Sequence, residues 1–248
     1  MSVFVGTSGW SYDHWAGVLY PPRTPPVRRL EHYLREFRTV ELNTSFYRWP
    51  APATFATWRA QLPAGFRLSV KASRYLTHYR RLGSPEPWVE RMVAGWRELG
   101  DVAAVLLLQL RGDQDAAPDR LEHVLDLLPA DVRTALEPRH AGWDSDDVAR
   151  VLARHGAATC LADGAGVPAL QRDTAPFRYV RLHGPAREPL YAGGYTDEEL
   201  AGWAQRFAAW HDAGQDVHVY FNNDIGGHAV RNARTLCALL GPDVAPTA

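Results

Sequence analysis

Residues 104–110 read AVLLLQL, and every residue of this run except Gln109 is apolar. A continuous apolar run that is short for a helix is typical of a strand covered on both faces, as in a parallel sheet. Seven further β-rich runs occur along the chain, and amphipathic helical segments lie between most of them. The eight predicted strands cover residues 3–7, 39–43, 66–71, 104–110, 133–137, 157–162, 178–183 and 217–221.

Apolar residues that recur at helical spacing predict seven helices between and after these strands. The predicted helices cover residues 27–37, 52–62, 87–99, 118–128, 144–155, 196–210 and 229–240. Thr196, followed three residues later by Glu199, forms a capping-box pattern at the start of one of them. The segment 163–177 is rich in Gly, Pro and Ala, so we expect an irregular connection between the sixth and seventh strands.

Strands and helices that alternate about eight times in a chain of 248 residues predict an α/β fold. The expected architecture is a single (β/α)8 TIM-like barrel domain over residues 1–248. A doubly wound open sheet is the rival architecture. The residues after the first strand, GTSGWSYDHWAG, lack the Gly-rich phosphate-binding pattern of such sheets, which favours the barrel.

The composition is that of an ordinary globular protein, with 46% hydrophobic residues and a formal charge of −1. This charge argues against a general polyanion binder, and no apolar run approaches the roughly 20 residues of a membrane span. Two cysteines, Cys160 and Cys237, are too few for a disulfide framework or a zinc cluster. No secretory signal is visible at the N-terminus, so a cytoplasmic location is expected.

Lys71 is the one lysine among 27 basic residues, and the other 26 are arginines. A bias of this size favours Arg wherever Arg is tolerated. A position that keeps Lys indicates a need for a compact charge, or for an amine whose pKa falls on burial. We therefore expect Lys71 to bind a ligand or to take part in a reaction.

Polar residues stand at seven of the eight predicted strand ends, whereas the bodies of the strands are mostly apolar. The active site of a TIM barrel lies at the carboxyl ends of its strands. Because side chains alternate along a strand, Glu137 shares a face with Arg139, and Arg181 with His183. The strand-end residues are Glu41, Asn43, Lys71, Gln109, Glu137, Arg139, His140, Asp163, Arg181, His183, Asn222, Asn223 and Asp224.

Several segments together resemble the motifs of the YecE-like family, the domain of unknown function 72. In chain order they are GTSGWSYDHWAGVLYP, VELNTSFYRWP, SVKASRYLTH, LLLQL, LEPRHAGW, VRLHGP and VYFNNDIGGHAVRNA. The resemblance spans about residues 5–240 and implies a TIM-like barrel, but it brings no established activity. The family's polar positions correspond to Glu41, Asn43, Lys71, His78, Gln109, Glu137, Arg139, His140, Arg181, His183 and Asn222. Trp49, the stretch 110–119 and the short 163–177 connection depart from the pattern without touching these residues.

The charges of the predicted site favour metal-free acid/base chemistry on a small anionic, sugar-like substrate that carries a phosphate or a carboxylate. Arginine forks suit either anion, a carboxylate serves as general base, and a histidine as acid or proton shuttle. No cofactor is predicted. The expected catalytic residues are Glu41, Lys71, Glu137 and His183. The expected substrate-binding residues are Trp10, Asn43, Tyr47, His78, Gln109, Arg139, His140, Arg181, Asn222 and Asn223.

Two alternatives remain open. In the first, Glu41, Glu137, Asp163 and His183 hold a divalent metal for an isomerase or hydrolase, although the neighbouring cations compete for the carboxylates. In the second, loop aromatics such as those of the Phe46–Trp49 stretch bind a carbohydrate or nucleic acid. The near-zero net charge gives a nucleic-acid partner little support, and no membrane partner is expected.

Overall fold

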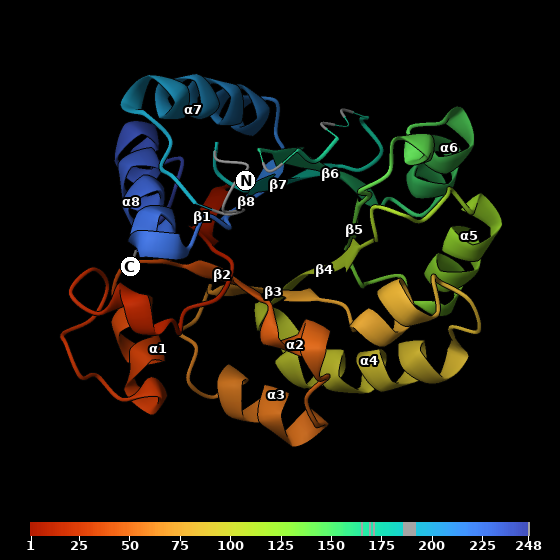
Figure 1. Cartoon of the computed structure of the whole chain (residues 1–248), viewed down its shortest axis with the longest axis horizontal. Helices are drawn as coiled ribbons and strands as arrows, with labels where there is room; N and C mark the ends of the chain where they lie inside the picture. The colour runs from red at the N-terminus through yellow and green to blue at the C-terminus, as the bar shows by residue number, and fades with distance from the viewer. Residues whose placement is uncertain (165, 169, 171, 186–191, 248) are drawn as a thin grey trace. The chain divides into compact units, whose positions relative to one another are not determined.

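The computed structural model describes residues 1–164, 166–168, 170, 172–185 and 192–247 (Figure 1). Its eight described strands are hydrogen-bonded in the order β1-β8-β7-β6-β5-β4-β3-β2. Each predicted strand is present, and its ends lie within one residue of the prediction. The strands are β1 (Val3–Thr7), β2 (Thr39–Leu42), β3 (Arg67–Lys71), β4 (Ala103–Gln109), β5 (Thr134–Glu137), β6 (Ala158–Asp163), β7 (Phe177–Leu182) and β8 (Asp216–Phe221).

The seven predicted helices are also present, and the alternation of strands and helices confirms the α/β fold of the TIM-like barrel type. The helices are α1 (Pro26–Leu34), α3 (Pro52–Arg59), α4 (Glu86–Leu99), α5 (Pro118–Leu127), α6 (Asp146–Arg154), α7 (Asp197–Asp212) and α8 (His228–Leu240). Two short elements were not predicted: α2 (Thr44–Tyr47) and a single π-helical turn, Tyr75–Tyr79. None of the helices among the described residues is long and apolar enough to cross a membrane.

Local signals at two connections are confirmed. At the start of α7, the Glu199 amide donates to the Thr196 hydroxyl at 3.2 Å, and the Thr196 amide donates back to the Glu199 carboxylate at 2.7 Å. This is the capping box that the sequence predicts. Between β6 and β7, the described residues form neither helix nor strand, as expected for the irregular connection.

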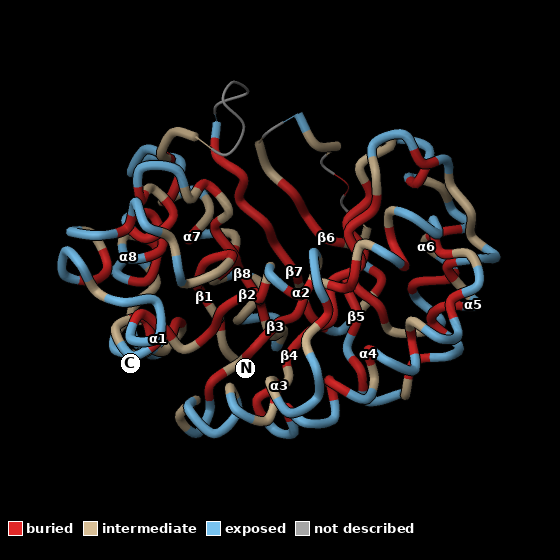
Figure 2. Tube along the Cα trace, turned by 60° about the horizontal axis from the view of Figure 1, so that its bottom comes forward, coloured by how far each residue is buried: buried red, intermediate tan, exposed pale blue. Residues whose placement is uncertain are grey.

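The strands carry the core (Figure 2). Along β4, every residue after Ala103 is buried, and Val105 through Leu108 are at most 1% exposed. This burial explains why the run is apolar without alternation, since both faces of the strand are covered. Polar residues therefore gather where the strands end, as the strand-end pattern predicts.

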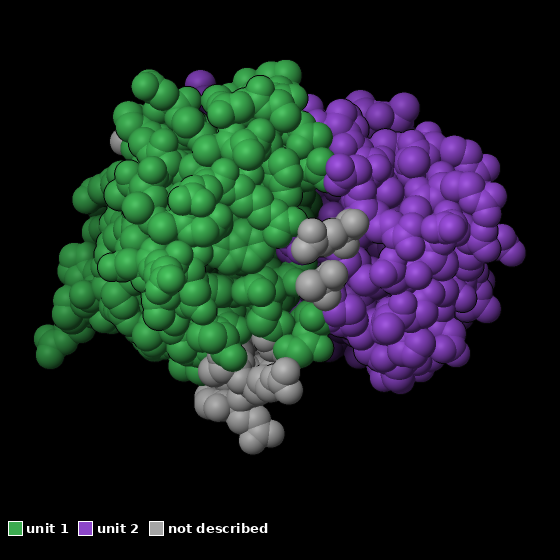
Figure 3. Space-filling model, turned by 90° about the horizontal axis from the view of Figure 1, so that it is seen from above, with its two compact units in different colours: residues 1–41, 162–167, 177–248 green, residues 42–161, 168–176 purple. Residues whose placement is uncertain are grey.

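The chain divides into two compact units (Figure 3). Unit 1 comprises Met1–Glu41, Ala162–Val167 and Phe177–Ala248. It contains β1, β7 and β8, in which β8 pairs with both of the others in parallel. Helix α7 packs beside α8, which covers β1 and β8 (Figure 1).

Unit 2 comprises Leu42–Leu161 and Pro168–Pro176. It contains β3, β4 and β5, which pair in parallel, and Gln109 at the end of β4 lies opposite Glu137 at the end of β5. Helix α3 packs on α4 (Figure 1), where Gly95 gives the Phe55 ring room. The prediction that residues 1–248 form a single domain stays a prediction.

Candidate functional site

In unit 1, a fully buried carboxylate lies among hydrogen-bond donors. Glu41, the third residue of β2, has no exposed surface, and neither has Arg181 of β7. Arg181 donates to the carboxylate through Nε at 3.0 Å and Nη2 at 2.8 Å. The hydroxyls of Ser8 and Tyr179 donate to it at 2.6 and 2.7 Å. Four donors thus occupy a carboxylate that offers about four lone-pair positions.

These contacts decide the charge of Glu41. Burial by itself raises the pKa of this carboxyl, but the Arg181 charge and the hydrogen bonds from Ser8, Tyr179 and Arg181 outweigh it. The net effect is a lowered pKa, so Glu41 is ionised at neutral pH. Burial, and then the neighbouring Glu41, raises the pKa of the Tyr179 hydroxyl well above its usual value. Tyr179 is therefore a fixed donor in this group.

His183, directly after β7, is also buried. Its Nδ1 lies 3.0 Å from the side-chain amide nitrogen of Asn222. An amide N–H that points at Nδ1 makes this ring nitrogen the acceptor and leaves the proton of a neutral ring on Nε2. Asn223 has a different task, because its amide donates to the Gly193 carbonyl at 2.9 Å and to the Asn232 side chain at 3.0 Å. It ties the turn after β8 to α8.

In unit 2, Glu137 forms a second buried carboxylate group. It has no exposed surface and ends β5. Arg139 approaches one carboxylate oxygen at 2.6 Å, and the Gln109 amide donates to the other at 3.2 Å. The register of β4 and β5 places Gln109 opposite Glu137, so the pairing of the two strands builds this contact.

Lys71, at the end of β3, lies over the ring of Phe46, with Nζ 4.1 Å from the ring centroid. The same ring meets the imidazole of His78 edge to face at 4.7 Å. The Ser45 hydroxyl of α2 donates to the Lys71 carbonyl at 2.7 Å and holds α2 against β3. Helix α2 and the π-helical turn thus bring Lys71, Phe46 and His78 together.

Burial and the positive charge around His78 keep its ring neutral. Burial, followed by the charges of Lys71, Arg111 and Arg139, lowers the pKa of His78 to about 4, against a weaker opposing effect of Asp113. The Thr77 hydroxyl lies 2.9 Å from Nδ1 of the ring. At neutral pH, His78 is therefore an uncharged imidazole beside several cations, which is a suitable environment for an anion.

The other predicted site residues are more scattered. Tyr47 is exposed, and Asn43 is half-buried at the start of α2, where its Oδ1 is shielded from solvent without a hydrogen bond to any described residue. His140 caps the short turn that follows it by accepting from the Gly142 amide at 3.2 Å. Trp10 is half-buried. The Asp163 carboxylate accepts from the Tyr195 hydroxyl at 2.9 Å.

The predicted residues that come together thus form three groups, two in unit 1 and one in unit 2. Unit 1 brings Glu41 and Arg181 together, and separately His183 and Asn222. Unit 2 brings together Lys71, His78, Gln109, Glu137 and Arg139. That Lys71 and Glu137 of unit 2 meet His183 of unit 1 in one pocket stays a prediction.

A divalent-metal site was the main alternative. Within the described ranges, no three His, Cys, Asp or Glu side chains gather as a group that could hold a metal ion. The two buried carboxylates of that alternative instead face Arg181 and Arg139.

Sequence reasoning missed several participants. Ser8 and Tyr179 complete the Glu41 group, although Tyr179 lies two residues before Arg181 and its face on β7 was readable. Arg74, in the segment after β3, lies over the rings of both Tyr47 and Tyr79. No periodic signal marks Arg74 and Tyr79, because they lie on or beside a π-helical turn.

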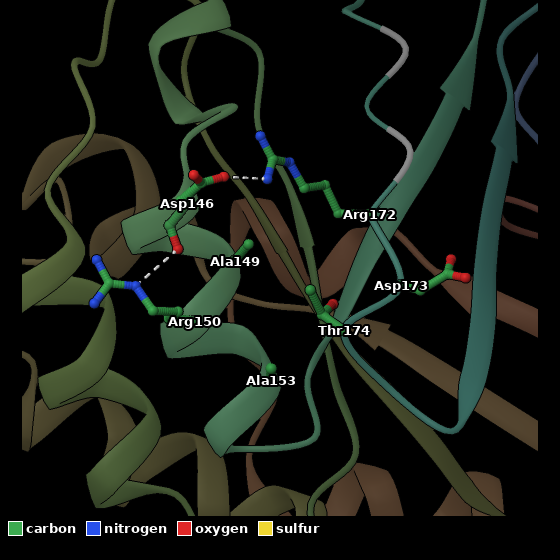
Figure 4. Close-up of a pocket in the computed structure, with 7 residues that line it drawn as sticks. All are labelled: Asp146, Ala149, Arg150, Ala153, Arg172, Asp173 and Thr174. Carbon is green, nitrogen blue, oxygen red and sulfur yellow. Dashed lines mark hydrogen bonds and ion pairs between the residues drawn. The ribbon is translucent and has the colours of Figure 1, made fainter.

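A shallow surface pocket of about 500 Å3 lies elsewhere in unit 2, beside α6 (Figure 4). Arg172 reaches across it to the Asp146 carboxylate at 2.7 Å and also pairs with Asp144. None of the predicted site residues lines this pocket, and its two arginines, Arg150 and Arg172, already pair with neighbouring carboxylates. It is a surface ion-pair network rather than a reaction site.

Known proteins resemble the chain over nearly its whole length. The family described as "Protein of unknown function DUF72" matches residues 4–247. The UPF0759 protein YunF of Bacillus subtilis is 26% identical over 96% of this chain and 94% of its own length. The UPF0759 protein YecE of Escherichia coli is 25% identical over 84% of this chain and 82% of its own length.

Solved structures give the same result. A DUF72 family protein of Thermotoga maritima superimposes with a TM-score of 0.84 at 26% identity and covers 97% of this chain and 99% of its own. A DUF72 family protein of Enterococcus faecalis, at 20% identity, shares the fold with a TM-score of 0.80 over 96% and 95% of the two chains. The resemblance seen in the motifs is thereby confirmed, and the chain belongs to the DUF72 family of proteins of unknown function.

Proposed function

We propose that the strand ends of unit 2 bind a small anionic substrate, which carries a phosphate or a carboxylate, and that the chain performs acid/base chemistry on it. The observation that carries the proposal is the group around His78. Lys71 and Arg139 approach it from the ends of β3 and β5, and its imidazole stays neutral among them. An anion placed there gains two charge-assisted contacts and a neutral ring N–H donor.

The balance of charge in this group supports an anionic ligand. Lys71 and Arg139 carry two positive charges, and Glu137 carries one negative charge. Beside them, Arg81 and Arg111 both contact Asp113, at 3.1 and 2.6 Å. An anionic substrate placed among these cations would gain charge-assisted contacts from them.

Two carboxylates were predicted as general bases, and the hydrogen bonds favour Glu137. The Glu41 carboxylate already accepts four hydrogen bonds, from Ser8, Tyr179 and twice from Arg181. A proton from a substrate has no vacant position there. Glu137 lies in the same group as Lys71, which allows it to take a proton from a substrate that Lys71 and Arg139 hold. The role of His183 as proton donor stays a prediction.

Thermal unfolding of the full chain tests the binding step. Inorganic phosphate, glucose 6-phosphate and malonate would each be titrated against the wild-type protein, the Lys71→Met variant and the surface control Arg150→Gln. We expect at least one anion to raise the wild-type Tm with concentration, and the shift to be lost in Lys71→Met but kept in Arg150→Gln. A ligand at 100 times its Kd stabilises the folded state by about 2.7 kcal/mol. If no anion raises the Tm, the proposal is wrong.

Proton exchange tests the chemical step. Sugar phosphates that bind would be incubated with the protein in D2O, and deuterium at carbon would be followed by NMR. We expect exchange with wild-type protein and its loss in Glu137→Gln. The same assay after chelator treatment distinguishes this proposal from the metal alternative. If the metal alternative holds, the protein contains a divalent ion that Glu137→Ala releases, and exchange stops when the ion is removed.

A further inference from the structure

We propose that the anion bound at the strand ends of unit 2 is the phosphate of a nucleotide, and that its base stacks on a neighbouring surface formed by Tyr47, Arg74 and Tyr79. We call this surface the Tyr–Arg platform. The inference rests on the proposed function, because it names the class of substrate for the same anion site.

The platform is built around one guanidinium. The Arg74 guanidinium carbon lies 5.7 Å from the centroid of the Tyr47 ring and 5.4 Å from that of the Tyr79 ring. Its Nε is shielded from solvent and has no hydrogen-bond partner in the part of the chain that the structure describes. Two aromatic rings therefore hold this side chain. A guanidinium held in this way also stacks well on a planar ring.

Both tyrosines present their rings to solvent. Tyr47 is 62% exposed and Tyr79 is 56% exposed. The only other exposed Phe, Trp or Tyr side chain among the described residues is Tyr75, which meets Tyr79 at 5.1 Å and stacks on Trp88. Single exposed apolar residues are common on protein surfaces and need no explanation, whereas exposed aromatic rings that gather at one place indicate a binding surface.

The platform continues into the anion site through a single ring. Phe46 meets Tyr47 edge to face at 5.1 Å and His78 edge to face at 4.7 Å, and the Lys71 ammonium lies over its face at 4.1 Å. One aromatic residue thus separates the cations of the strand ends from the exposed rings. A ligand that reaches both places must join an anionic group to a flat ring over a short distance.

A nucleotide fits this combination better than a sugar phosphate. Bases stack on tyrosine rings and on the plane of an arginine. Because every base offers a π-face, neither contact requires a particular base. A sugar phosphate would use the cations but leave the exposed rings of Tyr47 and Tyr79 without a stacking partner. The same chemistry is offered by a mononucleotide and by the 5′-terminal nucleotide of a single strand.

Calorimetric titration of the full chain tests the inference. The probes are adenosine 5′-monophosphate, ribose 5-phosphate, inorganic phosphate and a 5′-phosphorylated single-stranded tetranucleotide. We expect adenosine 5′-monophosphate to bind more tightly than ribose 5-phosphate by about 5- to 100-fold, the usual effect of stacking one base. If the tetranucleotide is tighter still, the source is the end of a nucleic-acid strand. If it is not, the source is a free nucleotide.

Variants on the platform separate stacking from anion binding. Tyr47→Ala and Tyr79→Ala should bring the affinity for the nucleotide down to that for ribose 5-phosphate and leave phosphate binding unchanged. Tyr47→Phe and Tyr79→Phe keep the rings and should keep the affinity. Leu239→Ala, which shortens an exposed apolar side chain on α8, is the control for a general surface effect.

The outcomes distinguish the two proposals. If phosphate binds but the nucleotide is no tighter than ribose 5-phosphate, or if the alanine variants bind the nucleotide as well as the wild type does, the platform is not a base site and the proposed function still stands. If none of the probes binds, both proposals fail together.

Discussion

Arg181 holds the carboxylate of Glu41 with two nitrogens, Nε and Nη2, and neither side chain has any exposed surface. An ion pair this deeply buried contributes little net stability when it is complete, because both charges have left water. Removing one partner is costly, since the other charge stays buried and uncompensated. The pair therefore joins β2 to β7 within unit 1, and removing one partner should strongly destabilise this region.

We expect Glu41→Gln to lower the free energy of unfolding by about 3–5 kcal/mol. Urea unfolding measures this loss. The matched control is Glu36→Gln, because Arg234 holds Glu36 with the same two-nitrogen geometry at 2.6 Å, but these side chains are 41% and 30% exposed. An exposed pair should lose only about 0–1 kcal/mol. Equal losses in the two variants would show that burial does not govern the Glu41 pair.

Two glycines in helices should respond to alanine in opposite directions. A Cβ at Gly95 of α4 would come within 2.5 Å of the Phe55 ring, whereas a Cβ at Gly202 of α7 would have no neighbour within 4 Å. Alanine favours a helix by about 1 kcal/mol over glycine, but overpacking costs about 1–3 kcal/mol. We expect Gly202→Ala to raise the unfolding free energy and Gly95→Ala to lower it. If Gly95→Ala raised the unfolding free energy instead, α3 and α4 would have to move apart at little cost to make room for the added methyl group.

The eight strands could be predicted to within a residue because the signal of a buried parallel strand is local. The run from Ala104 to Leu110 carries its own apolar pattern, and Gly100 and Gly112 on either side mark its limits. The polar strand ends were also predictable, since Lys71, Glu137 and Arg181 follow apolar stretches. These signals can be read without knowing which strands and helices pack against one another.

The partners within each group could be predicted only in part. The contact between Gln109 and Glu137 depends on the register of β4 against β5, and that between Ser8 and Glu41 on segments 33 residues apart. Arg74 lies over the rings of both Tyr47 and Tyr79 because the chain after β3 forms a π-helical turn. Side chains five residues apart carry no helical periodicity, so this geometry arises from tertiary packing.

Lys71→Arg should weaken anion binding far more than it weakens the fold. The Lys71 ammonium lies 4.1 Å above the Phe46 ring, and the larger, planar guanidinium cannot place a compact charge at the same point. We expect phosphate affinity to fall by about 10- to 100-fold, the usual value of a charge-assisted hydrogen bond, while the Tm changes by about 2 °C or less. Calorimetry and thermal unfolding give the two quantities. A Tm that falls while phosphate affinity holds would make Lys71 a structural residue, and Arg150→Lys on α6 controls for a general effect of the exchange.

His78 should make the protein less stable in mild acid. Its pKa is about 4 in the folded chain and 6.5 when unfolded, chiefly because of burial and the charge of Lys71. As the pH falls from 6.5 to about 4, the unfolded chain takes up a proton that the folded chain does not, so the free energy of unfolding declines over this window. His78→Gln should decline less steeply than the wild type in urea unfolding between these pH values. His32→Gln, which removes an imidazole from α1, is the control.

A bound anion should reverse this effect, because a negative charge beside the imidazole stabilises its protonated form. NMR titration of the His78 ring should therefore give a higher pKa in saturating phosphate than in its absence. The same shift should be missing in Lys71→Met if that variant no longer binds the anion. If phosphate leaves the pKa of His78 unchanged in the wild-type protein, the anion does not bind beside this imidazole. The site proposed at the ends of β3 and β5 would then be wrong.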